Sequence, residues 1–352
     1  MTAVSSTRGF VFNYVPRVDA KEITAKEFEK EYVEPRIPCF IDNLIESWPA
    51  YSLWTKDYFL TQHRETMIYS NEVGDENCLK GLSDPKNWMG LGHFIEELDR
   101  GGNRLHFSRS HPATDILNYK SGLLDQIELG TIERIMPRNQ FLGRGAMDWD
   151  AYPIIPPYSP NIFIGGAGLN ALPHYDPDTS HTFHWCVFGK KSVKMIDYER
   201  VKGIEIPLMK IYYDDMLEKL PDSLLRQLPQ LEGMPVWHAD LEPGDVLFMP
   251  SMNWHAFKYH DTSLATVLRY RSFSSLEGYL EFVAGVQTPL TMIGFHSSLY
   301  RQFPESQTHL FHRLLAAFPS IVSLFVRGML KLMRLIVRLR GHRSSCPGNQ
   351  SR

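Results

Sequence analysis

Five short runs rich in apolar, β-branched and aromatic residues crowd into residues 161–270, and turn residues such as Gly189 separate them. They read NIFIGG, HTFHWCVFG, SVKMID, DVLFMP and LATVLRY. Several short strands in one region are typical of a β-sandwich or small barrel, whereas strands that alternate with helices would indicate a parallel sheet. This stretch therefore predicts an all-β core, with one helical insertion at residues 213–228.

The segment before this core mixes helices with a strand. Thr24, with Glu27 three residues later, forms a capping box before AKEFEKEYVEP, so a helix is expected to begin there. The apolar run IPCFIDNLI that follows indicates a buried strand. A second helix is expected at residues 91–99, ended by the glycine pair at 101–102.

Three parts are expected along the chain. Residues 1–142 are expected to form an α+β part that packs on the barrel, and residues 143–275 to form the β-barrel core. Residues 276–352 form a helical C-terminal region with a basic amphipathic tail. The stretch 143–160, rich in Gly, Pro and aromatic residues, indicates a long loop that leads into the barrel.

Composition excludes several classes of protein. With 352 residues and 43% hydrophobic residues, the chain can bury a sizeable core, so disorder and fibrous folds are excluded. The four cysteines are scattered and form no CxxC pair, which argues against a disulfide framework and a thiolate zinc site. The first twenty residues lack the apolar core of a secretory signal. An intracellular, cytoplasmic location is the expectation.

A sequence pattern for metal binding stands out in PHYDPD. Side chains alternate on a strand, so His174 and Asp176 are expected to point the same way and can bind one metal ion. A third ligand from an opposing strand would complete a set of two histidines and one carboxylate, which leaves open positions on Fe(II). His255, in EPGDVLFMPSMNWHAF, is the candidate for that ligand.

A second HxD, formed by His238 and Asp240, weakens the pattern taken alone. With 14 histidines in the chain, about one HxD is expected by chance. His238 and Asp240 come just before the Pro243-Gly244 turn, which predicts an exposed strand edge rather than a ligand pair.

A lysine follows the Gly189 turn on the next predicted strand. Lys191, Val193 and Met195 share one face of this strand, and Lys190, Ser192 and Lys194 share the other. The face with two lysines is expected to meet solvent, so Lys191 should point inward. A buried lysine needs an anion, and in an iron site of this kind the far carboxylate of 2-oxoglutarate would supply it.

Taken together, these segments resemble the JmjC (cupin-type) Fe(II)/2-oxoglutarate oxygenases. The resemblance rests on HYD, on GKK ending at Lys191 seventeen residues after His174, and on EPGDVLFMPSMNWHAF, the most specific of the three. RVDAKEITAKEFEKEYVEPRIPCFIDNLIESWPAYSLW is also similar to the family's N-terminal part, so the resemblance covers roughly residues 15–275. The His-to-Lys spacing is most similar to the lysyl-hydroxylase branch related to the phosphatidylserine-receptor protein, and to small bacterial cupin-like oxygenases.

The resemblance implies a fold and a reaction. The fold is mainly β with flanking helices, a double-stranded β-helix of the jelly-roll type. His174, Asp176 and His255 would bind Fe(II), and Lys191 would bind the 2-oxoglutarate carboxylate. With dioxygen, the reaction would couple decarboxylation of 2-oxoglutarate to succinate with hydroxylation of a C–H bond, or with loss of an N-methyl group.

Three positions depart from the family pattern. Ala171 replaces a Thr or Ser, His184 an Asn, and Val267 a small polar residue. Other polar side chains are then candidates for the contacts to the cosubstrate, and an ordinary lining or surface role is the alternative for each of them. The candidates are Tyr158, Thr182, His184 and Arg269.

Alternatives to a hydroxylase remain open. They are an N-methyl demethylase, a cupin-type metal enzyme that uses no 2-oxoglutarate, and a non-enzymatic binding or scaffold protein. No zinc finger or basic recognition helix is apparent, which favours a protein side chain, an amino acid or another small molecule as the substrate. Residues 1–300 carry 28 basic against 39 acidic groups, a balance that weakly favours a cationic substrate.

The C-terminal tail carries the opposite charge. From Arg301 onward there are nine basic residues and one acid, and at 327–338 the basic residues share one face at helical spacing. Within this tail, the longest charge-free run, residues 314–326, is too short to span a bilayer. We expect a helix packed on the barrel or on a second subunit of a homodimer. Contact with an acidic membrane surface, a nucleic acid or an acidic protein is the alternative.

Overall fold

The computed structural model describes most of the N-terminal part and the barrel. The described residues are 10–72, 88–102, 104–107, 122–136, 161–174, 181–197, 226 and 229–270. Among them, no helix is long and apolar enough to cross a membrane. The predicted loop at 143–160, the region after residue 274 with its basic tail, and the predicted helical insertion apart from residue 226 lie outside this description.

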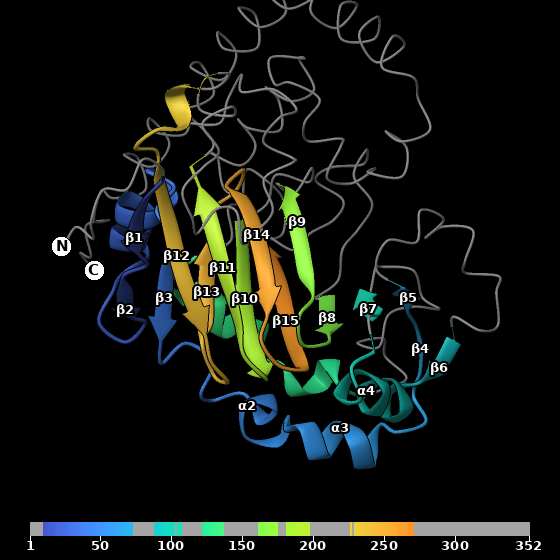
Figure 1. The fold of residues 1–352 in the computed structure, drawn as a ribbon. Helices are drawn as coiled ribbons and strands as arrows, with labels where there is room; N and C mark the ends of the chain where they lie inside the picture. The colour runs from blue at the N-terminus through green and yellow to red at the C-terminus, as the bar shows by residue number, and fades with distance from the viewer. Residues whose placement is uncertain are drawn as a thin grey trace, which may run out of the picture.

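Two mainly antiparallel sheets face each other and form the core of the chain (Figure 1). The smaller sheet has the order β1 (Val11–Tyr14), β12 (Pro235–Leu241), β11 (Lys191–Ile196), β14 (Trp254–Tyr259), β9 (Asn170–His174). The larger sheet has the order β2 (Arg17–Asp19), β3 (Cys39–Asp42), β13 (Val246–Met249), β10 (His181–Phe188), β15 (Ser263–Tyr270), β8 (Asn161–Gly165), β7 (Arg104–Phe107), β5 (Asn71–Glu72). The predicted jelly roll is confirmed.

The predicted strands all form. NIFIGG, HTFHWCVFG, SVKMID, DVLFMP and LATVLRY correspond to β8, β10, β11, β13 and β15. The turn at Gly189 joins β10 to β11, and its φ of 74° lies in the left-handed region. A Cβ atom at Gly189 would collide with the backbone of Thr262 in the adjacent turn, so this close approach requires glycine.

The N-terminal segment forms the predicted helix in a modified form. Thr24 and Glu27 make both hydrogen bonds of the capping box at the start of α1 (Ala25–Phe28). The helix then continues as a π-helical turn, Glu29–Val33, rather than as regular α-helix. Phe28 is fully buried and packs its ring against Phe248 of β13, at 5.0 Å between centroids, which anchors the segment to the larger sheet.

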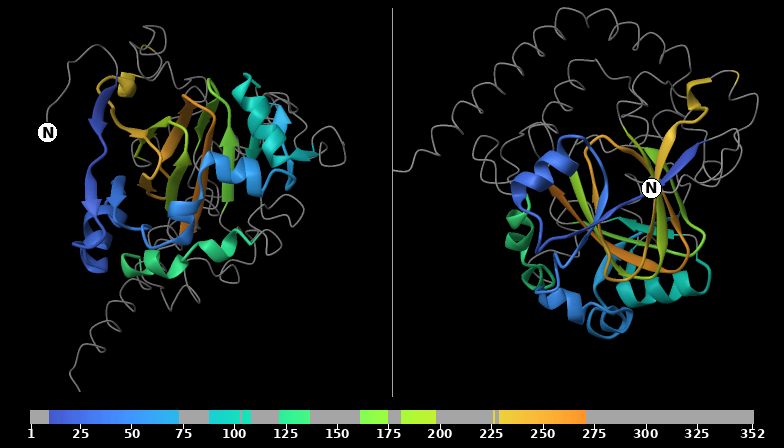
Figure 2. Two further views of the ribbon diagram at one scale, coloured as in Figure 1. Left: turned by 90° about the horizontal axis from the view of Figure 1, so that it is seen from below. Right: turned by 90° about the vertical axis from the view of Figure 1, so that its left-hand side faces the viewer.

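Short helices surround one end of the strands. They are α2 (Pro49–Leu53), α3 (Lys56–Gln62) and α4 (Leu91–Asp99), with 3-10 turns at Leu124–Gln126 and Leu129–Arg134. A further 3-10 turn, Pro229–Leu231, precedes β12 at the other end of the barrel (Figure 1). A two-stranded sheet of β4 (Met67–Tyr69) and β6 (Trp88–Gly90) lies beside α4. The predicted helix at residues 91–99 is confirmed as α4, and Gly101 follows it with a φ of 92°. Figures 1 and 2 show α2, α3 and α4 next to one another along the barrel.

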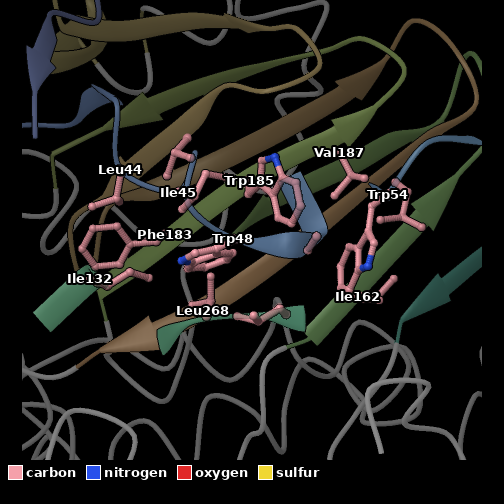
Figure 3. Close-up of a cluster of buried hydrophobic side chains, with 14 of the residues drawn as sticks. Leu44, Ile45, Trp48, Trp54, Ile132, Ile162, Phe183, Trp185, Val187 and Leu268 are labelled. Atoms are coloured by element: carbon pink, nitrogen blue, oxygen red, sulfur yellow. The ribbon is translucent and has the colours of Figure 1, made fainter. Parts of the chain in front are cut away.

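A tryptophan-rich cluster joins these helices to the outer face of the larger sheet (Figure 3). Trp185 of β10 stacks on Trp54, with ring centroids 5.4 Å apart, and meets Trp48 edge-to-face at 5.9 Å. Such aromatic pairs contribute about 1 kcal/mol each beyond their buried area. This cluster packs the outer side of β10 against the helices, whereas the inner side of the strand carries the polar residues Thr182 and His184.

Two sequence expectations about exposure are wrong. Lys194 and Ser192 are buried, at 0% and 2% exposed, instead of facing solvent. The Lys194 ammonium lies 5.5 Å from the centroid of the Phe12 ring on β1. The expected strand edge at His238 and Asp240 is also wrong, because β1 pairs with β12 in parallel, although the Asp240 side chain is 69% exposed as expected. The alternation of side chains identified the faces but could not reveal a strand contributed from the far N-terminus.

Candidate metal and cosubstrate site

Two predicted metal ligands occupy paired positions on neighbouring strands. His174 ends β9, and its Cα is paired directly with that of His255 near the start of β14. Directly opposite positions on an antiparallel pair have Cβ atoms about 5 Å apart and lie on one face of the sheet. His255 is buried, with its ring edge-to-face with the interior ring of Phe257. The side chain of His174 and all of Asp176 lie outside the described residues.

The ring of His255 has a fixed orientation. Its Nδ1 lies 2.9 Å from the backbone carbonyl oxygen of Asn253. A carbonyl oxygen only accepts hydrogen bonds, so Nδ1 must carry the proton. In the neutral ring this leaves Nε2 as the nitrogen that can bind a metal ion, which is the arrangement that metal-binding histidines usually adopt.

Lys191 lies nearer the other end of the barrel than His255 does. It is paired with Tyr259, whereas His255 is paired with Met195 four residues further along β11. The Lys191 side chain is 1% exposed, and Nζ has no hydrogen-bond partner among the described residues. Burial lowers the pKa of Lys191 from 10.5 to about 8. The amine is therefore still largely protonated at neutral pH.

Two aromatic rings surround this ammonium group. Nζ lies 5.0 Å from the ring centroid of Tyr259 and 5.6 Å from that of Phe257. Aromatic faces offset only part of the cost of burying a cation. A charged group without a hydrogen-bonded partner in the interior is expensive, so this position favours a bound anion.

His184, on β10 of the larger sheet, lies near Lys191 and His255 of the smaller sheet. Its ring stacks on Phe257, with centroids 4.8 Å apart, and its Nε2 has no hydrogen-bond partner among the described residues. The pKa of His184 is well below its ordinary value, mainly because of burial and further because of the charges of Lys191, His255 and Arg269. The ring is therefore neutral, and one of its nitrogens can donate to an anion.

The remaining polar candidates divide into described and undescribed residues. Thr182 and Arg269 are directly opposite on β10 and β15, both buried, in the same alternation as the pair His184 and Val267. Thr182, His184 and Arg269 thus share the inner face of the larger sheet. Tyr158 lies outside the described residues.

The second HxD lies elsewhere, in a hydrogen-bonded cluster of its own. His238 Nε2 is 3.2 Å from Asp240 Oδ1, and Ser192 Oγ donates to the same carboxylate oxygen at 2.7 Å. Ser192 alternates with the inward Lys191, so this cluster is on the outer face of the smaller sheet. In the part of the chain that the structure describes, no group of three His, Cys, Asp or Glu side chains could hold a metal ion.

Sequence reasoning missed several residues that line the interior. Cys186, Phe257 and Tyr259 all belong to the apolar cluster between the two sheets. Counting in steps of two from His255 gives Phe257 and Tyr259, so the strand period could have identified two of these three residues. The Asn253 carbonyl could not have been identified, because it belongs to the backbone.

A comparison with protein families decides the classification. The family model for the cupin-like domain matches residues 25–275. The chain belongs to the cupin-like domain family. That match covers the N-terminal helix and every strand of the barrel from β3 to β15.

Curated relatives of this cupin-like protein carry names that confirm the JmjC resemblance. It is 36% identical over 272 residues to the bifunctional arginine demethylase and lysyl-hydroxylase psr-1 of Caenorhabditis briggsae, covering 74% of this chain and 63% of the relative. It is 25% identical over 248 residues to lysine-specific demethylase 8 of Danio rerio, covering 68% and 54%. It is 21% identical over 244 residues to JmjC domain-containing protein D of Dictyostelium discoideum, covering 66% and 51%. The chain thus spans between about half and two thirds of the length of these relatives.

Proposed function

We propose that this cupin-like protein is an Fe(II)/2-oxoglutarate-dependent oxygenase that hydroxylates a C–H bond. The observation that carries the proposal is the buried Lys191 ammonium, which has no hydrogen-bond partner among the described residues. It lies in the same sheet as the paired positions of His174 and His255 on adjacent strands. A barrel that served only as a scaffold would gain stability by replacing this lysine with an apolar residue. Retention of the charge fits a site for a dicarboxylate.

The residues fit the group that the family implies. His174, Asp176 and His255 would hold the iron, two imidazoles and one carboxylate that leave room for a cosubstrate and dioxygen. When bound, iron with 2-oxoglutarate supplies dioxygen activation coupled to decarboxylation of the cosubstrate to succinate. The protein provides the binding groups and the enclosed space for this chemistry.

Individual side chains have distinct tasks in this proposal. Lys191 binds the far carboxylate of 2-oxoglutarate, and His184, stacked on Phe257, donates a hydrogen bond that orients the same molecule. Phe257 and Tyr259 keep water away from the ion pair between Lys191 and the 2-oxoglutarate carboxylate, which strengthens this ion pair. His255 keeps its proton on Nδ1 and offers Nε2 to the metal.

The substrate we propose is a protein side chain, with lysyl residues first. The support is the lysyl-hydroxylase name of the relative that is 36% identical and the excess of acidic groups in residues 1–300, which attracts a cation. Free amino acids and other small molecules are the next class to test. Demethylation of an N-methyl group is the second candidate reaction, because two relatives carry demethylase names.

The test begins without a substrate. Purified protein with Fe(II), ascorbate and 2-oxoglutarate should form succinate slowly, and His255→Ala should abolish this turnover. Peptides that contain lysine or N-methylated arginine and lysine are then added. Hydroxylation adds one oxygen atom to the peptide mass, whereas demethylation removes a methyl group and releases formaldehyde. Succinate formation that is the same with and without iron would refute the proposal in favour of a scaffold.

A further inference from the structure

The turn that precedes β14 has a tightly defined backbone. Asn253 donates its backbone N–H to the carbonyl of Pro250 at 3.3 Å, and Met252 has a φ of 68°. A four-residue turn with a left-handed residue only at its third position is a type II turn, in which glycine is the usual choice there. Methionine at this position is strained, so surrounding contacts must hold the turn in this form.

A fully buried histidine supplies one of these contacts. The pairing of β10 with β13 runs from Trp185–Val246 up to Thr182–Met249. The next residue of the turn, Pro250, has no N–H to donate. Beyond it, the backbone N–H of Ser251 donates to Nδ1 of His181, at 3.0 Å, so a side chain continues the connection that the strand ladder can no longer make.

His181 is well suited to remain an acceptor. It is 0% exposed, and its ring stacks on Phe248 with centroids 5.5 Å apart. A backbone N–H only donates, so Nδ1 must be unprotonated. Burial, with a smaller effect of the Arg36 charge, lowers the pKa of His181 to about 3, which agrees with a neutral ring at physiological pH.

The other end of the same turn contacts the predicted metal ligand. The Asn253 carbonyl accepts the hydrogen bond from Nδ1 of His255, at 2.9 Å. Ser251, Met252 and Asn253 are all buried, at 0%, 2% and 2% exposed. The connection from His181 to His255 therefore runs through three buried residues. Because they are closely packed, a displacement of the backbone at Ser251 is transmitted to Asn253.

We propose that His181 is a positioning residue for the metal ligand His255. By holding Ser251, it fixes the type II turn, and the turn presents the Asn253 carbonyl that sets the tautomer and direction of the His255 ring. The inference rests on the proposed function, because it assumes that His255 binds a metal ion. Groups that orient a metal-binding histidine in this way commonly change metal affinity by about 10- to 100-fold when removed.

Three variants separate positioning from packing. His181→Phe keeps a ring that can stack on Phe248 but removes the acceptor. His181→Asn restores it, because the asparagine Oδ1 is the same number of bonds from Cα as the histidine Nδ1. Phe183→Leu is the matched control, since Phe183 is buried on the outer face of the same strand and its ring packs on Phe28, Phe248 and Tyr270.

The measurement is Co(II) binding to the full chain, followed by the visible absorption of the bound ion. We expect His181→Phe to weaken Co(II) binding about tenfold and His181→Asn to recover most of it. Phe183→Leu should lower the melting temperature and leave the affinity unchanged. A folded His181→Phe with wild-type Co(II) affinity would overturn the inference, as would equal weakening by Phe183→Leu.

A fourth variant tests the same connection from its other end. Ser251→Pro removes the N–H donor, and proline is favoured at the second position of a type II turn. Ser251→Pro should weaken Co(II) binding about as much as His181→Phe does. If His181→Phe does not fold, Ser251→Pro tests the role of the hydrogen bond in its place. Wild-type affinity in Ser251→Pro overturns the inference while the proposed function stands. Wild-type protein that binds no Co(II) overturns both.

Discussion

Replacing Lys191 with methionine should stabilise the protein and abolish its cosubstrate binding. The side chain is 1% exposed, and its pKa falls from 10.5 to about 8 because burial disfavours the charged form. At about 1.4 kcal/mol for each pH unit of pKa change, the buried charge costs the folded state roughly 3 kcal/mol at pH 7. Methionine has a similar length and no charge, so Lys191→Met removes this cost.

The pH dependence has a defined sign. The folded protein releases the Lys191 proton near pH 8, but the unfolded chain keeps it until about pH 10.5. Below pH 8 both states are protonated and the full cost is present. Between these two values the unfolded state binds more protons, so the stability of the wild type rises with pH. The advantage of Lys191→Met should therefore shrink steadily from pH 8 to pH 10.5.

Urea unfolding of the metal-free protein at pH 7 and pH 9.5 measures the stability difference. Calorimetric titration of the metal-loaded protein with 2-oxoglutarate measures binding, and loss of a buried charge partner should weaken it at least about 30-fold. The exposed neighbour Lys190, paired with Glu242 at 2.8 Å, provides the control variant Lys190→Met, which should change neither property. A Lys191→Met protein that is less stable than the wild type and binds 2-oxoglutarate normally would refute this reasoning.

Three further predictions concern the fold and the second HxD. Phe28→Ala should lower the free energy of unfolding by about 3–5 kcal/mol, because its fully buried ring packs on Phe248. A decrease no larger than that caused by an alanine substitution at an exposed position would contradict this packing. Thr24→Ala should cost about 1 kcal/mol in urea unfolding, since it removes the capping box of α1, while Thr24→Ser should cost little. Asp240→Asn should leave Co(II) affinity and succinate formation unchanged, and a clear loss of metal binding would show that the second HxD had been set aside wrongly.

Strand positions and faces within the barrel were predictable because period-two alternation survives in the sequence. His255, Phe257 and Tyr259 follow one another at that spacing, and Lys191 is buried as its strand pattern predicted. Pairings between distant segments were not predictable: β1 adds to β12 in parallel across more than two hundred residues. The burial of Lys194 could not be read from its own strand, because alternation says which residues share a face and not what covers that face.

The hydrogen bonds that orient the site residues were the least predictable from the sequence. The role of the Asn253 carbonyl depends on a backbone atom, which leaves no pattern in residue types. His181 had no assigned place in the sequence reasoning, because a histidine that accepts a hydrogen bond in the core has no distinctive spacing. The π-helical turn at Glu29–Val33 was likewise not predictable, because helix propensity does not distinguish it from regular α-helix.

The central claim is that the barrel holds Fe(II) and 2-oxoglutarate together, and anaerobic titration tests it most directly. When 2-oxoglutarate chelates iron in such a site, a charge-transfer band appears in the visible spectrum. Adding 2-oxoglutarate to the Fe(II)-loaded wild type should produce this band with saturation, and His255→Ala should produce none. Lys191→Met should require far more 2-oxoglutarate to reach the same band. Iron-loaded wild type that shows no band at any 2-oxoglutarate concentration would contradict the account.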